Sequence, residues 1–177
     1  LSAVEQAAGV KNRTFTATEL VHSALGRIEQ KNAQLNAIVD LLDESALTAA
    51  QAADAAVADG KTLGPLHGVP VTVKVNVDTK GRATTNGMEI FKDTIAPDHS
   101  PVVSNLLKAG AILIGRTNTP EMSMRLTTDN PLHGLTRNPW DLQASPGGSS
   151  GGAASAGAAG FAAINPVSYT HLTLPTM

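Results

Sequence analysis

The spacing of hydrophobic residues predicts a helical first third of the chain, residues 1–60. Thr16 and Glu19 have the spacing of a capping box, and the apolar positions that follow recur every three or four residues, which is typical of one buried helix face. An alanine-rich run over 45–58 predicts a further helix. Between them, the short apolar stretch 35–42 is compatible with a strand or a buried turn.

Beyond residue 60 the pattern changes to that of an α/β unit. Strict alternation over 71–77 predicts a strand that places valines on one face and Thr72, Lys74 and Asn76 on the other. A helix from Pro101 through Ala109 and a short buried strand over 111–115 follow. We expect this helix to turn four apolar side chains inward: Val102, Val103, Leu106 and Leu107.

Composition excludes several classes of protein. The 177 residues carry a formal net charge of −2, with 42% hydrophobic and 16% charged residues, which favours a globular chain and argues against electrostatic binding of nucleic acid or a membrane surface. The absence of cysteine rules out disulfides, thiolate zinc sites and a cysteine nucleophile. The five histidines lack metal-ligand spacing, and no apolar run approaches the ~20 residues of a membrane span.

Two features suggest chemistry: a lysine on an apolar strand, Lys74, and the Gly/Ser run 147–152. Taken alone, Lys74 is compatible with a partly exposed strand residue, and the run with a flexible linker. The run leads into an alanine-rich helix over 153–159, however, and a glycine-rich turn opening a helix presents N–H groups to a phosphate or a developing oxyanion. No P-loop or G-x-G-x-x-G motif is present, and the G-x-S-x-G pattern at 147–151 lacks the preceding strand of a nucleophile elbow.

Four blocks in the chain resemble the amidase signature family, and they occur in the family's order. They are GPLHGVP at 64–70 leading to Lys74, GRTNTPE at 115–121, RNPWD at 137–141 and SPGGSSGG at 145–152. The resemblance implies the N-terminal portion of that fold, a mixed β-sheet flanked by helices and truncated here. Residues 1–166 would form a partial domain, with the helical segment 1–60 and an α/β core over 61–166.

The resemblance also implies roles for individual residues. Lys74 corresponds to the family's catalytic base, and Ser149 to its middle serine, which follows a cis peptide bond, contacts substrate and relays a proton. Ser123 aligns with a position that lines the acyl pocket, and Ser150 is the rival to Ser149. A lysine acts as a base only when neutral, so its pKa must be lowered. The family uses no metal or cofactor.

Other positions near these blocks are expected to have structural roles. Val75 stands where many relatives have aspartate, and we expect only a packing effect because it points to the opposite strand face. Trp140, the single tryptophan, is interpreted as a packing anchor beneath the serine loop, and His67 as a structural residue of the turn before Lys74.

The resemblance stops after Pro166. The attacking serine is expected 24 positions after Ser149 within a Gly-Gly-Ser-Ile-Arg block, but position 173 is threonine and the segment 168–177 contains no glycine. We therefore expect 167–177 to be a non-native tail, and a few residues to be missing before Leu1. The 177-residue chain alone is predicted to lack a nucleophile, to be inactive, and to be poorly soluble or partly molten.

The function implied for the parent protein is a cytoplasmic amidase that hydrolyses a small-molecule carboxylic amide to acid and ammonia through an acyl-serine intermediate. It would bind no nucleic acid and no membrane, and a homodimer is common among relatives. One alternative is the glutaminase (A) subunit of a tRNA-dependent amidotransferase, although the stretch 128–134 is more similar to the general amidases. Another is a non-catalytic truncated fragment.

Overall fold

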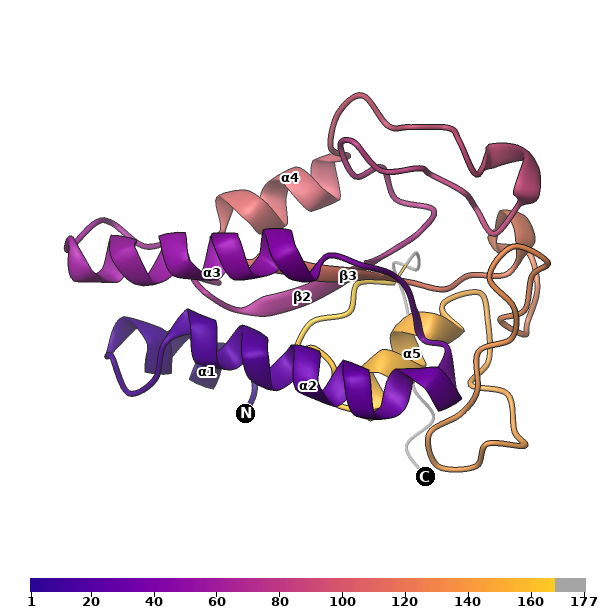
Figure 1. Ribbon diagram of the computed structural model, residues 1–177, viewed down its shortest axis with the longest axis horizontal. Helices are drawn as coiled ribbons and strands as arrows, with labels where there is room; N and C mark the ends of the chain where they lie inside the picture. The colour runs from indigo at the N-terminus through magenta and orange to yellow at the C-terminus, as the bar shows by residue number, and fades with distance from the viewer. Residues whose placement is uncertain (168–177) are drawn as a thin grey trace.

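The computed structural model describes residues 1–167 and centres on a small mixed β-sheet (Figure 1). Its strands are β1 (Ile38–Leu41), β2 (Pro70–Lys74) and β3 (Ile112–Thr117), in the order β1-β3-β2. β3 pairs antiparallel with β1 and parallel with β2. The chain returns to the free side of β2 near its end, where Ile164 bridges Val71 in parallel and accepts a hydrogen bond from the Thr72 amide.

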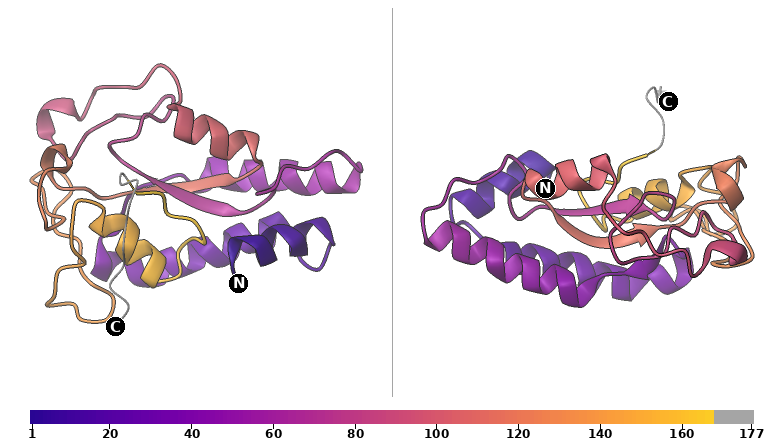
Figure 2. Two further views of the ribbon diagram at one scale, coloured as in Figure 1. Left: turned by 180° about the vertical axis from the view of Figure 1, so that it is seen from behind. Right: turned by 90° about the horizontal axis from the view of Figure 1, so that it is seen from above.

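Helices cover both faces of the sheet, and the right view of Figure 2 shows α3 and α4 on opposite sides of it. One core cluster joins α2, α3 and α5 to the Ile112 and Ile114 side of β3, and a smaller cluster joins α4 to Val69 and Val71. The bounds are α1 (Ala3–Lys11), α2 (Ala17–Leu35), α3 (Asp43–Ala58), α4 (Pro101–Lys108) and α5 (Gly151–Ala158), with 3-10 turns η1 (Glu89–Phe91) and η2 (Glu121–Ser123).

The helical first third is confirmed together with its capping box. The Thr16 hydroxyl accepts from the Glu19 amide at 3.0 Å, and the Glu19 carboxylate accepts from the Thr16 amide at 2.7 Å. The apolar stretch 35–42, which the sequence left open, contains strand β1. The division of the chain at residues 60 and 166 stays a prediction, and 168–177 of the expected tail lies outside the described residues.

Strand β2 is shorter than predicted and buried along its whole length. It ends at Lys74, and all five of its residues are buried, because the strand is paired along both edges and helices cover both faces of the sheet. Interpreting Lys74 as a partly exposed strand residue is therefore wrong, since its exposed fraction is 1%.

Helix α4 covers the sheet with a narrower stripe than predicted. Val103 is buried, but Val102 and Leu107 are 49% and 38% exposed, so the inward orientation expected for those two is wrong. An eight-residue helix has only two turns, and a single i, i+3 stripe, here Val103 and Leu106, reaches the sheet.

Candidate active site

The Lys74 amine lies where strand β2 meets the loop that opens α5. Its Nζ donates to the Ser149 hydroxyl at 2.9 Å and to the Ser150 hydroxyl at 3.3 Å. The two sides of this contact are 75 residues apart in the sequence, and both serines are buried. The chain that follows α5 returns to β2, where Ile164 bridges Val71.

Burial sets the protonation of the lysine. Loss of hydration disfavours the ammonium form and lowers the pKa of Lys74 from 10.5 to about 8. At pH 7 about a tenth of such amines are neutral, compared with about one in several thousand for an ordinary lysine. The neutral form of the Lys74 amine is therefore accessible near neutral pH.

The serine loop has the backbone geometry that the resemblance implies. The Gly148–Ser149 peptide bond is cis, and Gly147 has a φ of +86°, which favours glycine. A Cβ atom on Gly148 would stand 2.5 Å from the carbonyl oxygen of Arg125, so the neighbouring segment leaves no room for a side chain there.

Ser123 reaches the same site through a chain of hydroxyl contacts. Its Oγ accepts from the side-chain nitrogen Nδ2 of Asn76 at 3.1 Å and shares a hydrogen bond of 2.9 Å with the Thr119 hydroxyl. The Thr119 hydroxyl also lies 3.3 Å from the carbonyl oxygen of Ser149 and donates to it. The structure thus brings together all three residues singled out from the sequence, Lys74, Ser123 and Ser149.

Sequence reasoning missed Thr119 and Asn76. Both had a signal: Thr119 lies inside the GRTNTPE block, and Asn76 shares the predicted strand face of Lys74. The contacts do not by themselves separate Ser149 from Ser150, because Lys74 donates to both. The shorter distance favours Ser149, as does its place in the SPGGSSGG block, and its role stays a prediction.

The interpretation of Trp140 as an anchor beneath the loop is wrong, since its side chain is 85% exposed. Its backbone amide donates a hydrogen bond of 2.9 Å to the Asn138 side chain, in a turn that directs the indole outward.

His67 contacts the carbonyl oxygen of Ala53 at 3.0 Å, which agrees with the structural role expected for it. Within residues 1–167 no group of three His, Cys, Asp or Glu side chains could hold a metal ion.

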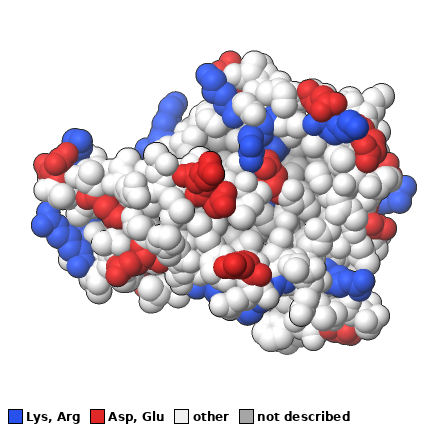
Figure 3. Space-filling model, in the orientation of Figure 1, with Lys and Arg blue, Asp and Glu red and all other residues white. Residues whose placement is uncertain are grey.

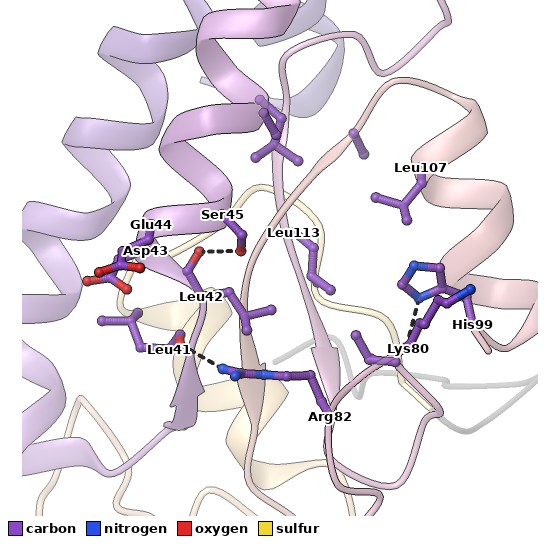
Figure 4. Close-up of a pocket in the computed structure, with 14 residues that line it drawn as sticks. Leu41, Leu42, Asp43, Glu44, Ser45, Lys80, Arg82, His99, Leu107 and Leu113 are labelled. Carbon is purple, nitrogen blue, oxygen red and sulfur yellow. Dashed lines mark hydrogen bonds between the residues drawn. The ribbon is translucent and has the colours of Figure 1, made fainter. Parts of the chain in front are cut away.

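A cavity of about 550 Å³ lies away from this site, beside β1 and the beginning of α3 (Figure 4). Leu42, Leu107 and Leu113 line it together with Arg82 and His99, and none of the three candidate residues does.

Charged side chains of both signs are mixed over the face seen in Figure 3. None of the helices in the described part of the chain is long and apolar enough to cross a membrane.

Comparison with known proteins gives consistent matches. The family model described as Amidase matches residues 19–166. The indoleacetamide hydrolase of Bradyrhizobium diazoefficiens is 56% identical over 163 residues, which are 92% of this chain and 31% of that protein. A glutamyl-tRNA(Gln) amidotransferase subunit from Alkaliphilus metalliredigens is 41% identical over 156 residues, 88% of this chain and 32% of that protein.

Solved structures of amidases also match this chain. A bacterial aryl acylamidase of the amidase signature enzymes superimposes with a TM-score of 0.87 at 35% identity, over 92% of this chain and 34% of the other. Fatty acid amide hydrolase superimposes with a TM-score of 0.90 at 32% identity, over 93% of this chain and 29% of the other. The predicted α/β fold is thereby confirmed, and the chain spans about a third of the length of the relatives it matches.

Proposed function

This chain belongs to the amidase family, and from that premise we propose that it supplies the base and the relay serine of an enzyme that hydrolyses a carboxylic amide to acid and ammonia. The observation that carries the proposal is the 2.9 Å contact between the Lys74 amine and the Ser149 hydroxyl, inside a buried site that lowers the pKa of the lysine to about 8.

The proposed proton path follows from this geometry. Neutral Lys74 accepts the proton of the Ser149 hydroxyl, and Ser149 accepts the proton of an attacking serine hydroxyl as that oxygen bonds to the amide carbon. When the carbon–nitrogen bond breaks, the relay returns a proton to the leaving ammonia. Water then hydrolyses the acyl-serine by the same relay, which releases the acid and restores the starting protonation state.

The attacking serine is proposed to come from a part of the enzyme that this chain does not span. Position 173, where the family would place it, is threonine and lies outside the described residues. The relatives are about three times as long as the matched segment, so their remaining length has room for such a residue. We further propose a cytoplasmic, homodimeric full-length enzyme.

The proposed substrate is a small-molecule amide, and indoleacetamide is the first to test because of the 56% identical hydrolase. A second candidate is the glutaminase component of a tRNA-dependent amidotransferase, which the 41% identity to such an enzyme's subunit favours. Release of ammonia from glutamine only in the presence of partner subunits would support the second candidate over the first.

The test begins with the source DNA read past codon 166. A frame that restores a Gly-Gly-Ser-Ile-Arg block gives a full-length enzyme, and the 177-residue chain is assayed beside it for ammonia release. We expect turnover from the full-length enzyme and none from the short chain. Absence of any such frame would support the alternative of a non-catalytic fragment.

The base is tested by Lys74→Met, which keeps the apolar stem and removes the amine. We expect turnover by the full-length enzyme to fall at least about a thousandfold, since Ser149 then has no amine to accept its proton. Lys108→Met, at an exposed position of α4, is the matched control and should leave turnover unchanged. Retained activity in Lys74→Met would remove the base assignment.

A further inference from the structure

One buried hydroxyl contacts both ends of the serine loop. Thr128 lies on a segment that precedes the loop by about twenty residues, and none of its surface is exposed. Its Oγ1 donates to the carbonyl oxygen of Gly147 at 3.0 Å and accepts from the amide of Gly151 at 3.0 Å. Between these two contacts lie the cis peptide bond and both serines that face Lys74.

The contact with Gly151 satisfies one first-turn amide of α5 from outside the helix. Ser150 occupies the N-cap position of α5, where a serine hydroxyl usually accepts from a first-turn amide, but it makes no side-chain cap hydrogen bond. The Gly151 amide, at the first position of the helix, donates to Thr128. The Ser150 hydroxyl accepts from Lys74 at 3.3 Å and makes no cap hydrogen bond to the helix.

The fit around this hydroxyl is close. A Cβ atom on Gly151 would overlap the Thr128 Oγ1, and one on Gly148 would meet the backbone of residues 125–127. The carbonyl oxygen of Thr128 in turn accepts from the Thr136 amide at 2.9 Å, which fixes the segment that carries the hydroxyl. Each end of the loop is therefore hydrogen-bonded to the buried Thr128 hydroxyl, and the glycines of the loop have no side chains that could make further contacts.

We propose that Thr128 is a positioning residue that holds the loop 147–151 so that the hydroxyls of Ser149 and Ser150 stay within hydrogen-bond distance of Lys74. It acts through the loop backbone and touches neither the lysine nor the substrate. The inference rests on the proposed function, in which Lys74 is the base and Ser149 the relay.

The test compares the wild-type chain with three variants. Thr128→Val keeps the volume and removes both hydrogen bonds, and Thr128→Ser restores the hydroxyl. Thr85→Val is the matched control, because the buried Thr85 hydroxyl likewise accepts from a glycine amide, Gly87 at 3.3 Å, and contacts the ring of His133 at 3.0 Å. These contacts are not with the loop 147–151.

Two measurements are made on each protein by NMR: the hydrogen-exchange rate of the Gly151 amide, and the pH titration of the Lys74 Cε signal in a chain labelled with ¹³C-lysine. In Thr128→Val we expect Gly151 exchange to rise at least about tenfold and the pKa of Lys74 to move up from about 8 toward 10.5, as water reaches the amine. Thr128→Ser and Thr85→Val should keep both wild-type values.

Failure of this inference can be told from failure of the proposed function. Unchanged Gly151 exchange and Lys74 titration in Thr128→Val would overturn the positioning role, as would a Gly151 amide that exchanges freely in the wild type or equal changes in Thr128→Val and Thr85→Val. A protected Gly151 amide beside a Lys74 that titrates like an ordinary lysine would instead count against the base, and so against the proposed function.

Discussion

At the scale of single residues, the cost of burying Lys74 links the chemistry of the site to the stability of the fold. The amine would carry its charge in water with a pKa of 10.5, and burial lowers that pKa to about 8. A shift of this size corresponds to a free energy of about 3 kcal/mol. At neutral pH the charged Lys74 amine thus lowers the stability of the fold, and the same burial provides the neutral amine that the proposed mechanism requires.

This penalty predicts a pH dependence of stability. Below pH 8 the amine is charged in both states and the folded state bears the full cost. Between pH 8 and 10.5 the unfolded chain binds more protons than the folded one, so stability rises with pH. Urea unfolding of the wild type and Lys74→Met from pH 7 to 10 should show the wild type gaining about 2–3 kcal/mol relative to the variant. A constant difference across this range would contradict the burial of an ionisable amine.

The sequence can identify a site residue only when that residue stands in a recognisable motif or is unusual for its position. Lys74 and Ser149 were predicted because a charged residue on an apolar strand and a glycine-flanked serine are unusual and stand in motif blocks. Thr128 was missed because a single buried threonine resembles any other until its partners are known. Trp140 was misjudged because hydrophobicity alone does not say whether a turn directs a side chain inward.

At the scale of elements, helix α5 approaches the end of β3 without any intervening side chain. A Cβ atom on Gly152 would overlap the backbone nitrogen of Asn118, the residue that follows β3. The helix and the strand end are therefore in backbone contact, and this contact sets the depth at which the serine loop sits.

We expect Gly152→Ala to lower the free energy of unfolding by at least about 2 kcal/mol, because the helix must move away from Asn118. Gly26→Ala is the matched control within α2. Nothing lies within 4 Å of the added Cβ there, and alanine favours the helix by about 0.5–1 kcal/mol. Urea unfolding measures both, and equal effects of the two substitutions would contradict the backbone contact.

A buried arginine joins β3 to the segment that follows Lys74. The Arg116 guanidinium pairs with Asp40 at 3.2 Å and donates to the carbonyl oxygens of Val75, Val77 and Ala83. Its side chain is 2% exposed, so these acceptors have no water to replace a lost donor.

Arg116→Lys keeps the charge but cannot donate to four acceptors from one planar group, and we expect it to cost about 3 kcal/mol of stability. Arg82→Lys is the comparison, since Arg82 also pairs with Asp40 but its side chain is 41% exposed, and it should cost about 1 kcal/mol or less. Thermal unfolding would contradict this account if the two variants lost the same stability.

The elements themselves were largely predictable, and the errors were at their ends and faces. Periodicity and a capping box identified α2, and alternation identified β2, because both depend on local spacing. The alternation continued to Val77, whereas pairing with β3 ends at Lys74, and pairing depends on residues distant in the sequence. For the same reason, the exposure of Val102 and Leu107 could not be read from α4 alone.

At the scale of the whole molecule, three large apolar side chains that precede the serine loop in the sequence are exposed. Met124, Leu126 and Trp140 are 83%, 87% and 85% exposed. The exposure of these three side chains is compatible with their being covered by further protein. This agrees with a chain that spans about a third of its relatives' length.

The single tryptophan provides a direct measurement of this surface. We expect Trp140 fluorescence in the 177-residue chain to resemble that of free tryptophan and to be quenched readily by acrylamide, since the indole is in water. In a full-length enzyme whose remaining residues cover this segment, quenching should decrease. A shielded, blue-shifted emission from the short chain would contradict the exposed position.

The 75 residues that separate Lys74 from Ser149 also determine the order of events during synthesis. At ~5–20 residues per second, a ribosome adds Ser149 about 4–15 s after Lys74. During this interval the contact between the amine and the Gly/Ser loop cannot form, and the strand that carries the amine cannot yet pair with Ile164. The nascent protein therefore cannot form the contact between Lys74 and Ser149 until the last part of the described chain is being made.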